Sequence, residues 1–320
     1  MSEYYSDLIF SNIELSRIVI KYGLHLKSNS LEEIYEKIYR LFDKTKLIQY
    51  YNQVQAIKYD LNKYKYFYIT YFDSHYPVLL KEIHDPPLIL FYKGNIDIFC
   101  SKFTGVVGTR KPSVTSLSFT SSLVGVIRQR EKQGIISGLA NGIDREAMIS
   151  AINLGMPLIG VMGTGFNKEY PNTNSDLYKL MKYSENTLII TETTPFEKSG
   201  KWSFPRRNRI ISGISESIVI MEASNESGAM TTAYHALQQN REIIVFDDES
   251  QKCNDGGRKL IEEGAKRITK DDINSSSKLI HLSELFGESN SNISGSLAML
   301  GKLEMEGKVK DRGGGYFEFL

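Results

Sequence analysis

Short apolar runs alternate with amphipathic segments through the middle of the chain. The runs are bounded by Gly, Asn, Asp or Ser, and each is typical of a buried strand. They span Phe103–Val107, Ile135–Ser137, Leu158–Met162, Leu188–Thr191, Ile218–Met221 and Ile243–Phe246. Helical periodicity fills the intervals Leu117–Gln129, Arg145–Asn153, Ser175–Tyr183 and Met230–Gln239. Strands that alternate with helices predict βαβ units, and therefore an α/β fold with a parallel sheet covered on both faces.

The first 62 residues carry a purely helical pattern. Ser30 and Glu33 predict a capping box, in which each side chain accepts a hydrogen bond from the backbone N–H of the other residue. Apolar residues then recur at helical spacing as far as Phe42. Residues 67–95 differ, because they contain two or three short strand patterns and a Pro-Pro turn. We assign them to the same domain as the strands that follow.

The C-terminal part begins with a polar linker at 274–277. A helix around Ser294–Glu304, a strand, a triple-glycine turn at 313–315 and a second strand follow, in the order that ends a winged-helix module. We therefore predict three units. They are a helical domain (1–62), an extended Rossmann-like domain (63–273), and a linker with a short winged-helix-like module (274–320).

Composition restricts the class of protein. The chain has 320 residues and is 41% hydrophobic, which is enough for a sizeable core and excludes an intrinsically disordered protein. No apolar run reaches the roughly 20 residues of a membrane helix, and the acidic, aromatic N-terminus is not a signal peptide. Cys100 and Cys253 alone make neither a disulfide scaffold nor a zinc site. We expect a soluble, cytoplasmic protein with no membrane partner.

Charge is balanced overall but concentrated in one segment. The net charge is +1, from 39 basic and 38 acidic side chains, so any contact with DNA requires local positive charge. Residues 198–211 hold five cations, an asparagine and two aromatic side chains. Arginine binds phosphate in a bidentate manner, and Phe204 or Trp202 could stack on a base. The residues predicted to bind DNA here are Lys201, Phe204, Arg206, Arg207, Asn208 and Arg209.

Glycine-containing turns follow several of the predicted strands. Because ligands of open parallel sheets bind at the carboxyl ends of the strands, these turns should meet at one site. Each turn leads into a helix whose N-terminal N–H groups favour an anion. Ser113 is predicted to cap one helix and Asp144 to be the N-cap of the next. The further candidate DNA contacts are Gly108, Arg110, Lys111, Ser113, Ser137, Gly138, Gly142, Ser227, Gly228 and Thr231.

Motifs for other chemistry are missing from the sequence. The turn Gly163-Thr164-Gly165 approaches a dinucleotide fingerprint, but Lys168 replaces its final glycine, which argues against NAD. We find no Walker A sequence, HExxH, nucleophile elbow or His/Cys cluster, and we expect no cofactor, no metal and no catalysis. Two alternatives stay open. One is a nucleotide sensor or nucleotide-hydrolysing enzyme that uses Glu192 or Glu222 as a general acid or base. The other is a protein-binding adaptor acting through residues 281–320.

The motifs GTRKPS (108–113), SGLANGID (137–144), FPRRNRIISGIS (204–215) and MEASNESGAMTTA (221–233), in this order, resemble the DprA/Smf family of DNA-processing proteins. The resemblance covers roughly residues 67–267. It implies a homodimer that binds single-stranded DNA, mostly through phosphates, in a basic pocket of an extended Rossmann domain. It also implies help in loading RecA during natural transformation.

The resemblance also implies roles for individual residues. It makes Arg110 and Lys201 phosphate contacts, Phe204 a base-stacking residue, and residues 207–209 the RNR motif of the family. The chain departs from the family pattern at three places. Met148 stands where a histidine is usual, Asp247-Asp248 where Pro-Gly is usual, and Arg258 where an asparagine is usual. The two aspartates are expected to add negative charge at the rim of the pocket and to restrict a ligand there.

Overall fold

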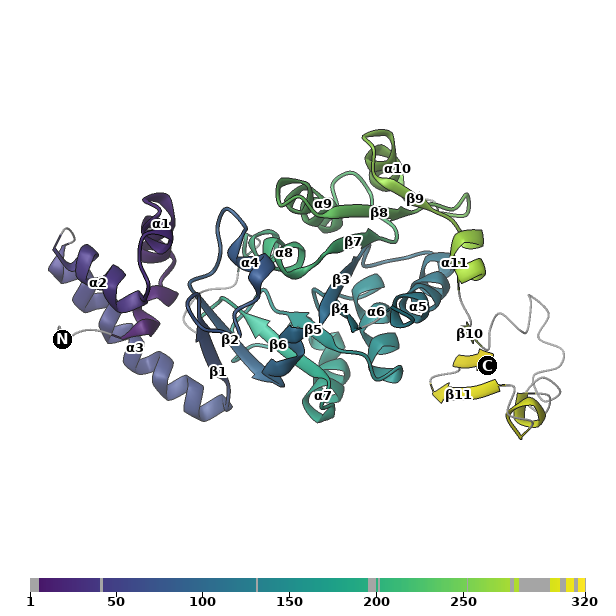
Figure 1. Ribbon diagram of the computed structural model, residues 1–320, viewed down its shortest axis with the longest axis horizontal. Coiled ribbons are helices and arrows are strands. Elements are labelled where there is room, and N and C mark those ends of the chain that lie inside the picture. The colour runs from purple at the N-terminus through teal and green to yellow at the C-terminus, as the bar shows by residue number, and fades with distance from the viewer. Residues whose placement is uncertain are drawn as a thin grey trace.

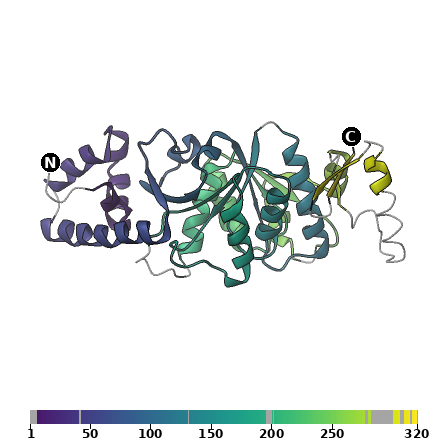
Figure 2. The same cartoon turned by 90° about the horizontal axis from the view of Figure 1, so that it is seen from below.

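A nine-stranded sheet runs through the centre of the molecule in the computed structural model, with helices on both faces (Figure 1). The structure describes residues 6–40, 43–130, 132–194, 200, 202–251, 253–276, 279–281, 300–305, 309–313 and 316–319. The N-terminal helices lie at one end of the long axis and the C-terminal strands at the other (Figure 2). This arrangement confirms the predicted α/β fold with a mostly parallel sheet.

The order of strands in the sheet differs from their order in the chain. Side by side they are β1 (Phe67–Thr70), β2 (Ile89–Gly94), β6 (Thr187–Thr191), β5 (Leu158–Val161), β4 (Gln133–Ser137), β3 (Lys102–Val107), β7 (Ser217–Ile220), β8 (Glu242–Phe246) and β9 (Lys266–Ile268). Strands β3 to β9 are mutually parallel, whereas β2 runs antiparallel to both β1 and β6. In the centre, Gly105 of β3 pairs with Ile136 of β4 and with Ile218 of β7.

Successive residues of the central strands belong to two separate cores, one on each face of the sheet. Val107 and Ile136 pack into one core, and their neighbours Val106 and Ile135 pack into the other. A strand that is buried on both faces of a sheet has apolar residues at successive positions. This explains the short continuous apolar runs in the sequence.

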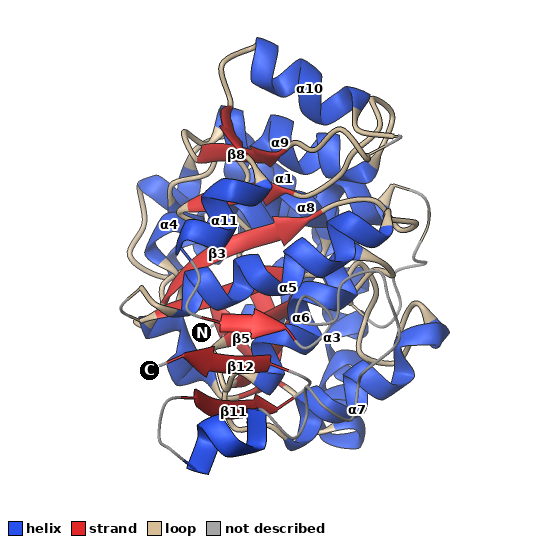
Figure 3. Ribbon diagram, turned by 90° about the vertical axis from the view of Figure 1, so that its right-hand side faces the viewer, coloured by secondary structure: helices blue, strands red, loops and turns tan. Residues whose placement is uncertain are grey.

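Helices cover both faces of the sheet, as the side view in Figure 3 shows. One face carries α5 (Val114–Arg128), α6 (Ile143–Asn153) and α7 (Ser175–Tyr183). The other carries α4 (Val78–Lys81), α8 (Ser203–Ile214) and α9 (Gly228–Gln238). Near the β9 edge lie α10 (Asp255–Glu262) and α11 (Lys270–Ser276). The helices predicted between strands are confirmed, and α7 has the predicted bounds.

The chain changes its direction across the sheet at one point. From β3 to β6 each new strand adds on one side, whereas β7, β8 and β9 add on the other side of β3. The connections that leave β3 and β7 therefore diverge to opposite faces. A crevice opens between them at the carboxyl ends of these strands, where sheets of this kind bind their ligands.

The N-terminal helices are α1 (Ile13–Lys21), α2 (Leu31–Tyr39) and α3 (Lys44–Tyr64), with short 3₁₀ turns at Asp7–Ser11 and Leu24–Leu26. Helix α2 begins at the predicted N-cap, because the Ser30 Oγ accepts from the Glu33 N–H at 3.1 Å. The reciprocal half of the predicted capping box is wrong. The Glu33 carboxylate accepts instead from the N–H of Asn29, the residue before the N-cap, at 2.9 Å.

Strands β10 (Leu279–His281), β11 (Val309–Gly313) and β12 (Tyr316–Phe319) form a second, antiparallel sheet. Residues 300–305 are helical, while residues 294–299 of the predicted helix, and Gly314 and Gly315 of the predicted turn, lie outside the described residues. The helix–strand–strand order of the described part is as predicted. The predicted polar linker at 274–277 is wrong for residues 274–276, which form the end of α11. None of the helices within the described ranges combines the length and the apolar character that crossing a membrane requires.

Candidate functional site

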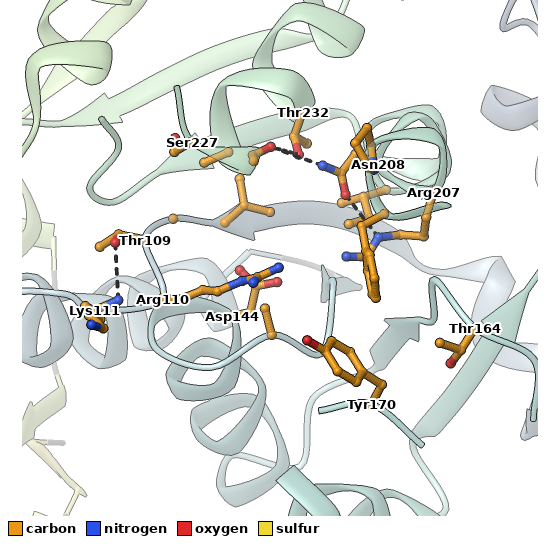
Figure 4. A pocket seen from close by; sticks show the side chains of 18 of the residues that line it. Thr109, Arg110, Lys111, Asp144, Thr164, Tyr170, Arg207, Asn208, Ser227 and Thr232 are labelled. Atoms are coloured by element: carbon orange, nitrogen blue, oxygen red, sulfur yellow. Dashed lines mark hydrogen bonds between the residues drawn. The ribbon is translucent and has the colours of Figure 1, made fainter. Parts of the chain in front are cut away.

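A pocket of about 950 Å³ opens at the carboxyl ends of β3 and β7, in the crevice at the reversal point. Turns from five separate parts of the chain form its wall (Figure 4). The residues that line it combine polar and cationic side chains with two aromatic rings and several glycines. They include Gly108, Thr109, Arg110, Lys111, Asp144, Thr164, Lys168, Tyr170, Phe204, Arg207, Asn208, Ser227, Gly228 and Thr232.

The turn after β3 is held at both ends by one residue, Glu222, which lies just beyond the end of β7. The backbone oxygen of Glu222 accepts from the Thr109 N–H at 2.8 Å. The carboxylate of Glu222 accepts from both the N–H and the hydroxyl of Ser113, each at 2.9 Å. Ser113 caps α5 as predicted, but it lies outside the pocket lining because its hydroxyl faces Glu222. Arg110, at the tip of this anchored turn, points into the pocket (Figure 4).

The turn after β4 supports the first turn from beneath. Gly142 has φ +75°, and a Cβ there would lie 2.4 Å from the carbonyl oxygen of Thr109. Only glycine fits this close approach without strain. Gly142 is also the N-cap of α6, so the prediction that Asp144 caps this helix is wrong. Asp144 lies in the first helical turn and accepts from the Gly138 N–H at 3.0 Å. Neither Gly142 nor the buried Ser137 lines the pocket, and Gly138 lines a small adjoining cavity.

Two buried charges flank Gly138. A Cβ on this residue would come within 2.6 Å of Arg207 Nη2 and 2.7 Å of Asp144 Oδ2. Arg207 Nη1 donates to the carbonyl oxygen of Gly138 at 2.7 Å and also to that of Val161. Burial raises the pKa of the Asp144 carboxyl, and the charge of Arg207 opposes this rise. Burial lowers the pKa of Arg207, and Asp144 opposes that change. Arg207 therefore ties together the ends of β4 and β5.

The other two arginines of the predicted DNA-binding segment do not reach the pocket. Arg209 donates to both carboxylate oxygens of Glu192, at 2.9 and 2.8 Å, and it also pairs with Asp85 at 3.2 Å. Arg206 pairs with Glu192 at 3.0 Å. The side chains of Arg209 and Glu192 are only 7% and 8% exposed, so this cluster is internal. The sequence grouped Arg206 and Arg209 with the ligand contacts, and the structure corrects their position.

The aromatic wall of the pocket comes from Phe204 and Tyr170. Their ring centroids lie 5.2 Å apart, with the planes inclined at 45°. Phe204 packs closely over Gly163, where a Cβ would lie 2.7 Å from its ring. Trp202, the other predicted stacking residue, is 49% exposed and lies outside the lining. The sequence did not single out Tyr170, although it closes the turn that follows β5.

Unpaired cations stand at the mouth of the pocket. Among the described residues, the side chains of Arg110, Lys111 and Lys168 form no hydrogen bond or ion pair. Lys168 was not predicted to bind a ligand, although its place in the glycine turn after β5 could have indicated it. The Thr164 hydroxyl fixes this turn by donating to the backbone oxygen of Lys168 at 2.6 Å. Lys201, which was predicted to contact phosphate, lies outside the described residues.

The N-terminus of α9 forms the roof of the pocket. Ser227 is its N-cap but makes no side-chain capping bond, and both Ser227 and Gly228 line the pocket. Asn208 holds this end of α9, because its amide donates to the backbone oxygen of Gly228 at 3.1 Å. Thr231, a predicted contact, is not among the lining residues, whereas Thr232 is.

Three acidic features differ from the sequence-based expectations. Glu192 pairs with two arginines, Glu222 holds the turn after β3, and neither lines the pocket. The predicted negative rim at Asp247 and Asp248 is also wrong. Asp247 pairs with Arg258 at 3.1 Å and with Arg267 at 3.0 Å, and Asp248 pairs with Lys270 at 2.9 Å. Two departures from the family pattern, Asp247 and Arg258, thus neutralise each other outside the pocket.

Comparison with protein families finds a match that covers about two thirds of the chain. The family described as DNA recombination-mediator protein A matches residues 67–278. The chain is 38% identical over 197 residues to DNA processing protein DprA of Bacillus subtilis, a match that covers 61% of this chain and 65% of the relative. It is also 38% identical over 200 residues to DprA of Streptococcus pneumoniae, covering 62% of this chain and 69% of the relative.

Solved structures agree with this match. The crystal structure of DprA from Streptococcus pneumoniae superposes with a TM-score of 0.69 at 30% identity, over 84% of this chain and 95% of the other. DprA from Helicobacter pylori, whose structure is described for its single-stranded DNA binding mode, superposes with a TM-score of 0.58 at 25% identity. That superposition covers 66% of this chain and 94% of the other.

Proposed function

Because the chain belongs to the DNA recombination-mediator protein A family, we propose that it binds single-stranded DNA in the pocket between β3 and β7 and acts as a recombination mediator. The observation that carries this proposal is that one pocket combines the unpaired cations Arg110, Lys111 and Lys168 with the aromatic pair Phe204 and Tyr170. Cations that track a phosphate backbone, with aromatic rings that stack on bases, are what non-specific recognition of single strands requires.

Phosphate binding is also supported by the backbone. Gly228 and Ala229 line the pocket in the first turn of α9, where N–H groups have no partner within the helix. Such groups favour an anion, and no Cβ on Gly228 blocks the approach. The rigid anchoring of the turn after β3 on Glu222 keeps Arg110 in place before DNA arrives. Little ordering of the turn's backbone therefore opposes binding.

We propose that the site binds without catalysing a reaction. Asp144 is the one carboxylate among the described lining residues, and its Oδ2 already accepts the Gly138 N–H. Glu192 and Glu222, the candidate acids of the alternative hydrolase, are occupied elsewhere. A nucleotide-hydrolysing role therefore has no free acid or base among the lining residues that the structure describes.

The partners follow from the family. We propose that the chain works as a homodimer and helps to load RecA onto incoming single strands during natural transformation. We keep the division into a helical domain (1–62), a DNA-binding domain (63–273) and a C-terminal module (274–320) as part of this proposal.

The test is fluorescence anisotropy with a labelled single-stranded oligonucleotide over a range of salt concentrations. We expect tight binding that weakens as salt rises, because phosphate contacts release counterions. In Arg110→Ala/Lys168→Ala, the slope of log K against log salt should fall by about 1.4, or about 0.7 for each lost phosphate contact. Lys21→Ala/Lys27→Ala, which removes two exposed cations far from the pocket, is the matched control and should leave the slope unchanged.

Competition decides between the two kinds of ligand. Duplex DNA and a nucleoside monophosphate should displace the oligonucleotide poorly if the pocket binds a strand. Efficient displacement by the monophosphate would instead favour the nucleotide-sensor alternative. Absence of oligonucleotide binding at low salt would refute the proposed function.

A further inference from the structure

A second basic surface begins where the pocket ends. The turn after β5 carries Lys168 at the mouth of the pocket, and its next residue, Glu169, pairs with Lys182 of α7 at 2.6 Å. Lys182 lines an open groove together with Gly94 and Asn95, the residues that follow Lys93. The path from the pocket thus continues along α7 to the end of β2.

From β2 the same surface reaches the N-terminal helices. Lys93 Nζ donates to the backbone oxygen of Tyr64, at 2.9 Å, at the last turn of α3. Lys63 of that turn stands over the rings of Tyr64 and Tyr59, at 5.2 and 5.9 Å from their centroids. Lys65 follows at the C-cap of the helix and is exposed. The five side chains that form this lysine track are Lys168, Lys182, Lys93, Lys65 and Lys63.

The lysine track keeps an excess of positive charge. Glu169 forms an ion pair with Lys182, and Glu185 is the one acidic residue among the described residues that line the groove. Asp60 is buried, where its carboxylate accepts from the Tyr66 hydroxyl at 3.1 Å. Lys63 and Lys65 have no hydrogen-bonded or ion-paired partner among the described residues, so their charges are available to a ligand.

Exposed aromatic rings accompany these lysines. Tyr183, beside Lys182 in the groove, is 88% exposed, and Tyr59, beneath Lys63, is 67% exposed. Rings exposed to this degree gain little from packing within the protein. Stacking on an unpaired base would bury them, and the bases of a duplex are not open to such stacking.

We infer that a single strand leaving the pocket past Lys168 continues along the lysine track, with its phosphates on the lysines and bases against Tyr183 and Tyr59. The inference rests on the proposed function, because the track is useful only to a strand held in the pocket. It assigns the end of α3, in the helical N-terminal part, a direct share in DNA binding.

The experiment compares the binding of two single-stranded oligonucleotides. One has about six nucleotides and fills the pocket, and the other has about twenty nucleotides and also reaches the lysine track. In Lys63→Gln/Lys65→Gln, the Kd for the long oligonucleotide should rise roughly three- to tenfold, the effect of two lost exposed charge contacts. Its salt slope should fall by about 1.4. The Kd for the short oligonucleotide should stay within about twofold of the wild-type value.

Two further variants make the outcome decisive. Lys21→Gln/Lys27→Gln removes two exposed lysines on α1 and the turn after it, one of them also over a tyrosine ring, and should leave both oligonucleotides unaffected. Tyr183→Ala, at a side chain too exposed to affect folding, should weaken only the long one. If the wild type binds both lengths equally and the variants change nothing, the track is refuted while the pocket stands. Failure of the wild type to bind either length refutes the proposed function instead.

Discussion

Replacing Arg207 by methionine should lower the stability of the fold rather than remove a DNA contact. Arg207 lines the pocket and belongs to the family's arginine motif, so the simplest expectation is a phosphate contact. Its guanidinium, however, is directed at two backbone carbonyls, those of Gly138 and Val161, and at the Asn208 side chain at 3.0 Å. Methionine keeps an unbranched apolar side chain, which is shorter, and loses all three hydrogen bonds.

The size of the effect follows from burial. Arg207 is 7% exposed and Asp144 is 5% exposed, so the substitution leaves a buried carboxylate and two buried carbonyls without their cation. Removing one partner of a buried charged pair costs about 3–5 kcal/mol. At about 2–4 °C per kcal/mol for a protein of this size, the Tm should fall by roughly 6–20 °C. Asp144→Asn in the same chain removes the uncompensated charge and should recover about 0.5–3 kcal/mol.

The predicted changes in stability are tested by comparing the Tm of the wild type, Arg207→Met, and Arg207→Met/Asp144→Asn in thermal unfolding. DNA binding is then measured by fluorescence anisotropy at a temperature where all three proteins are folded. The salt slope of DNA binding should be unchanged in Arg207→Met, whereas Arg110→Ala should lower the slope by about 0.7 and leave the Tm unchanged. A normal Tm together with a reduced salt slope in Arg207→Met would refute this reasoning and make Arg207 a phosphate contact.

Three other substitutions or conditions test separate features. Phe204→Ala should weaken single-strand binding by about 1–3 kcal/mol in an anisotropy titration, Phe204→Trp should restore binding, and Trp202→Ala, outside the lining, should have no effect. Gly142→Ala should lower stability by more than the 1–3 kcal/mol of a strained φ alone, because a backbone carbonyl lies 2.4 Å from the new Cβ. Gly155→Ala, at φ +65° with open space, should show the strain alone, and equal losses in urea unfolding would contradict the steric argument. Burial lowers the pKa of His25 below its usual 6.5, so the unfolded chain binds the proton first. Stability is then complete above about pH 6.5 and falls below it. A Tm series from pH 7.5 to 5.5 should show a smaller fall in His25→Leu.

The sequence predicted those parts of the fold that depend on neighbours in the chain. Ser113 and Ser30 cap their helices as expected, because an N-cap bond reaches only three residues ahead. The apolar runs became strands because both faces of the sheet are covered. The order of the strands was not predictable in this way, since whether β7 pairs with β3 or with β6 depends on contacts across the whole domain.

Predictions for the site failed where side chains meet across the sheet. Nothing near residue 206 in the sequence indicates that Glu192 will accept hydrogen bonds from both Arg206 and Arg209. The segment therefore looked like a free basic face, although all three of its arginines, Arg206, Arg207 and Arg209, have partners within the protein. In the same way, Asp247 and Arg258 each look like an isolated departure from the family pattern until the structure places them 3.1 Å apart.

The reversal of strand order also governs when the pocket can exist. Its two sides, the turn at Arg110 and the start of α9 at Ser227, meet across neighbouring strands although more than a hundred residues separate them. At a synthesis rate of about 5–20 residues per second, the second side emerges roughly 6–23 s after the first. In that interval a nascent chain can complete β3 to β6. The turn that carries Arg110 is then exposed, because the opposite side of the pocket has not yet been synthesised. Affinity for a single strand should therefore arise abruptly, late in translation, with the arrival of β7 and α9.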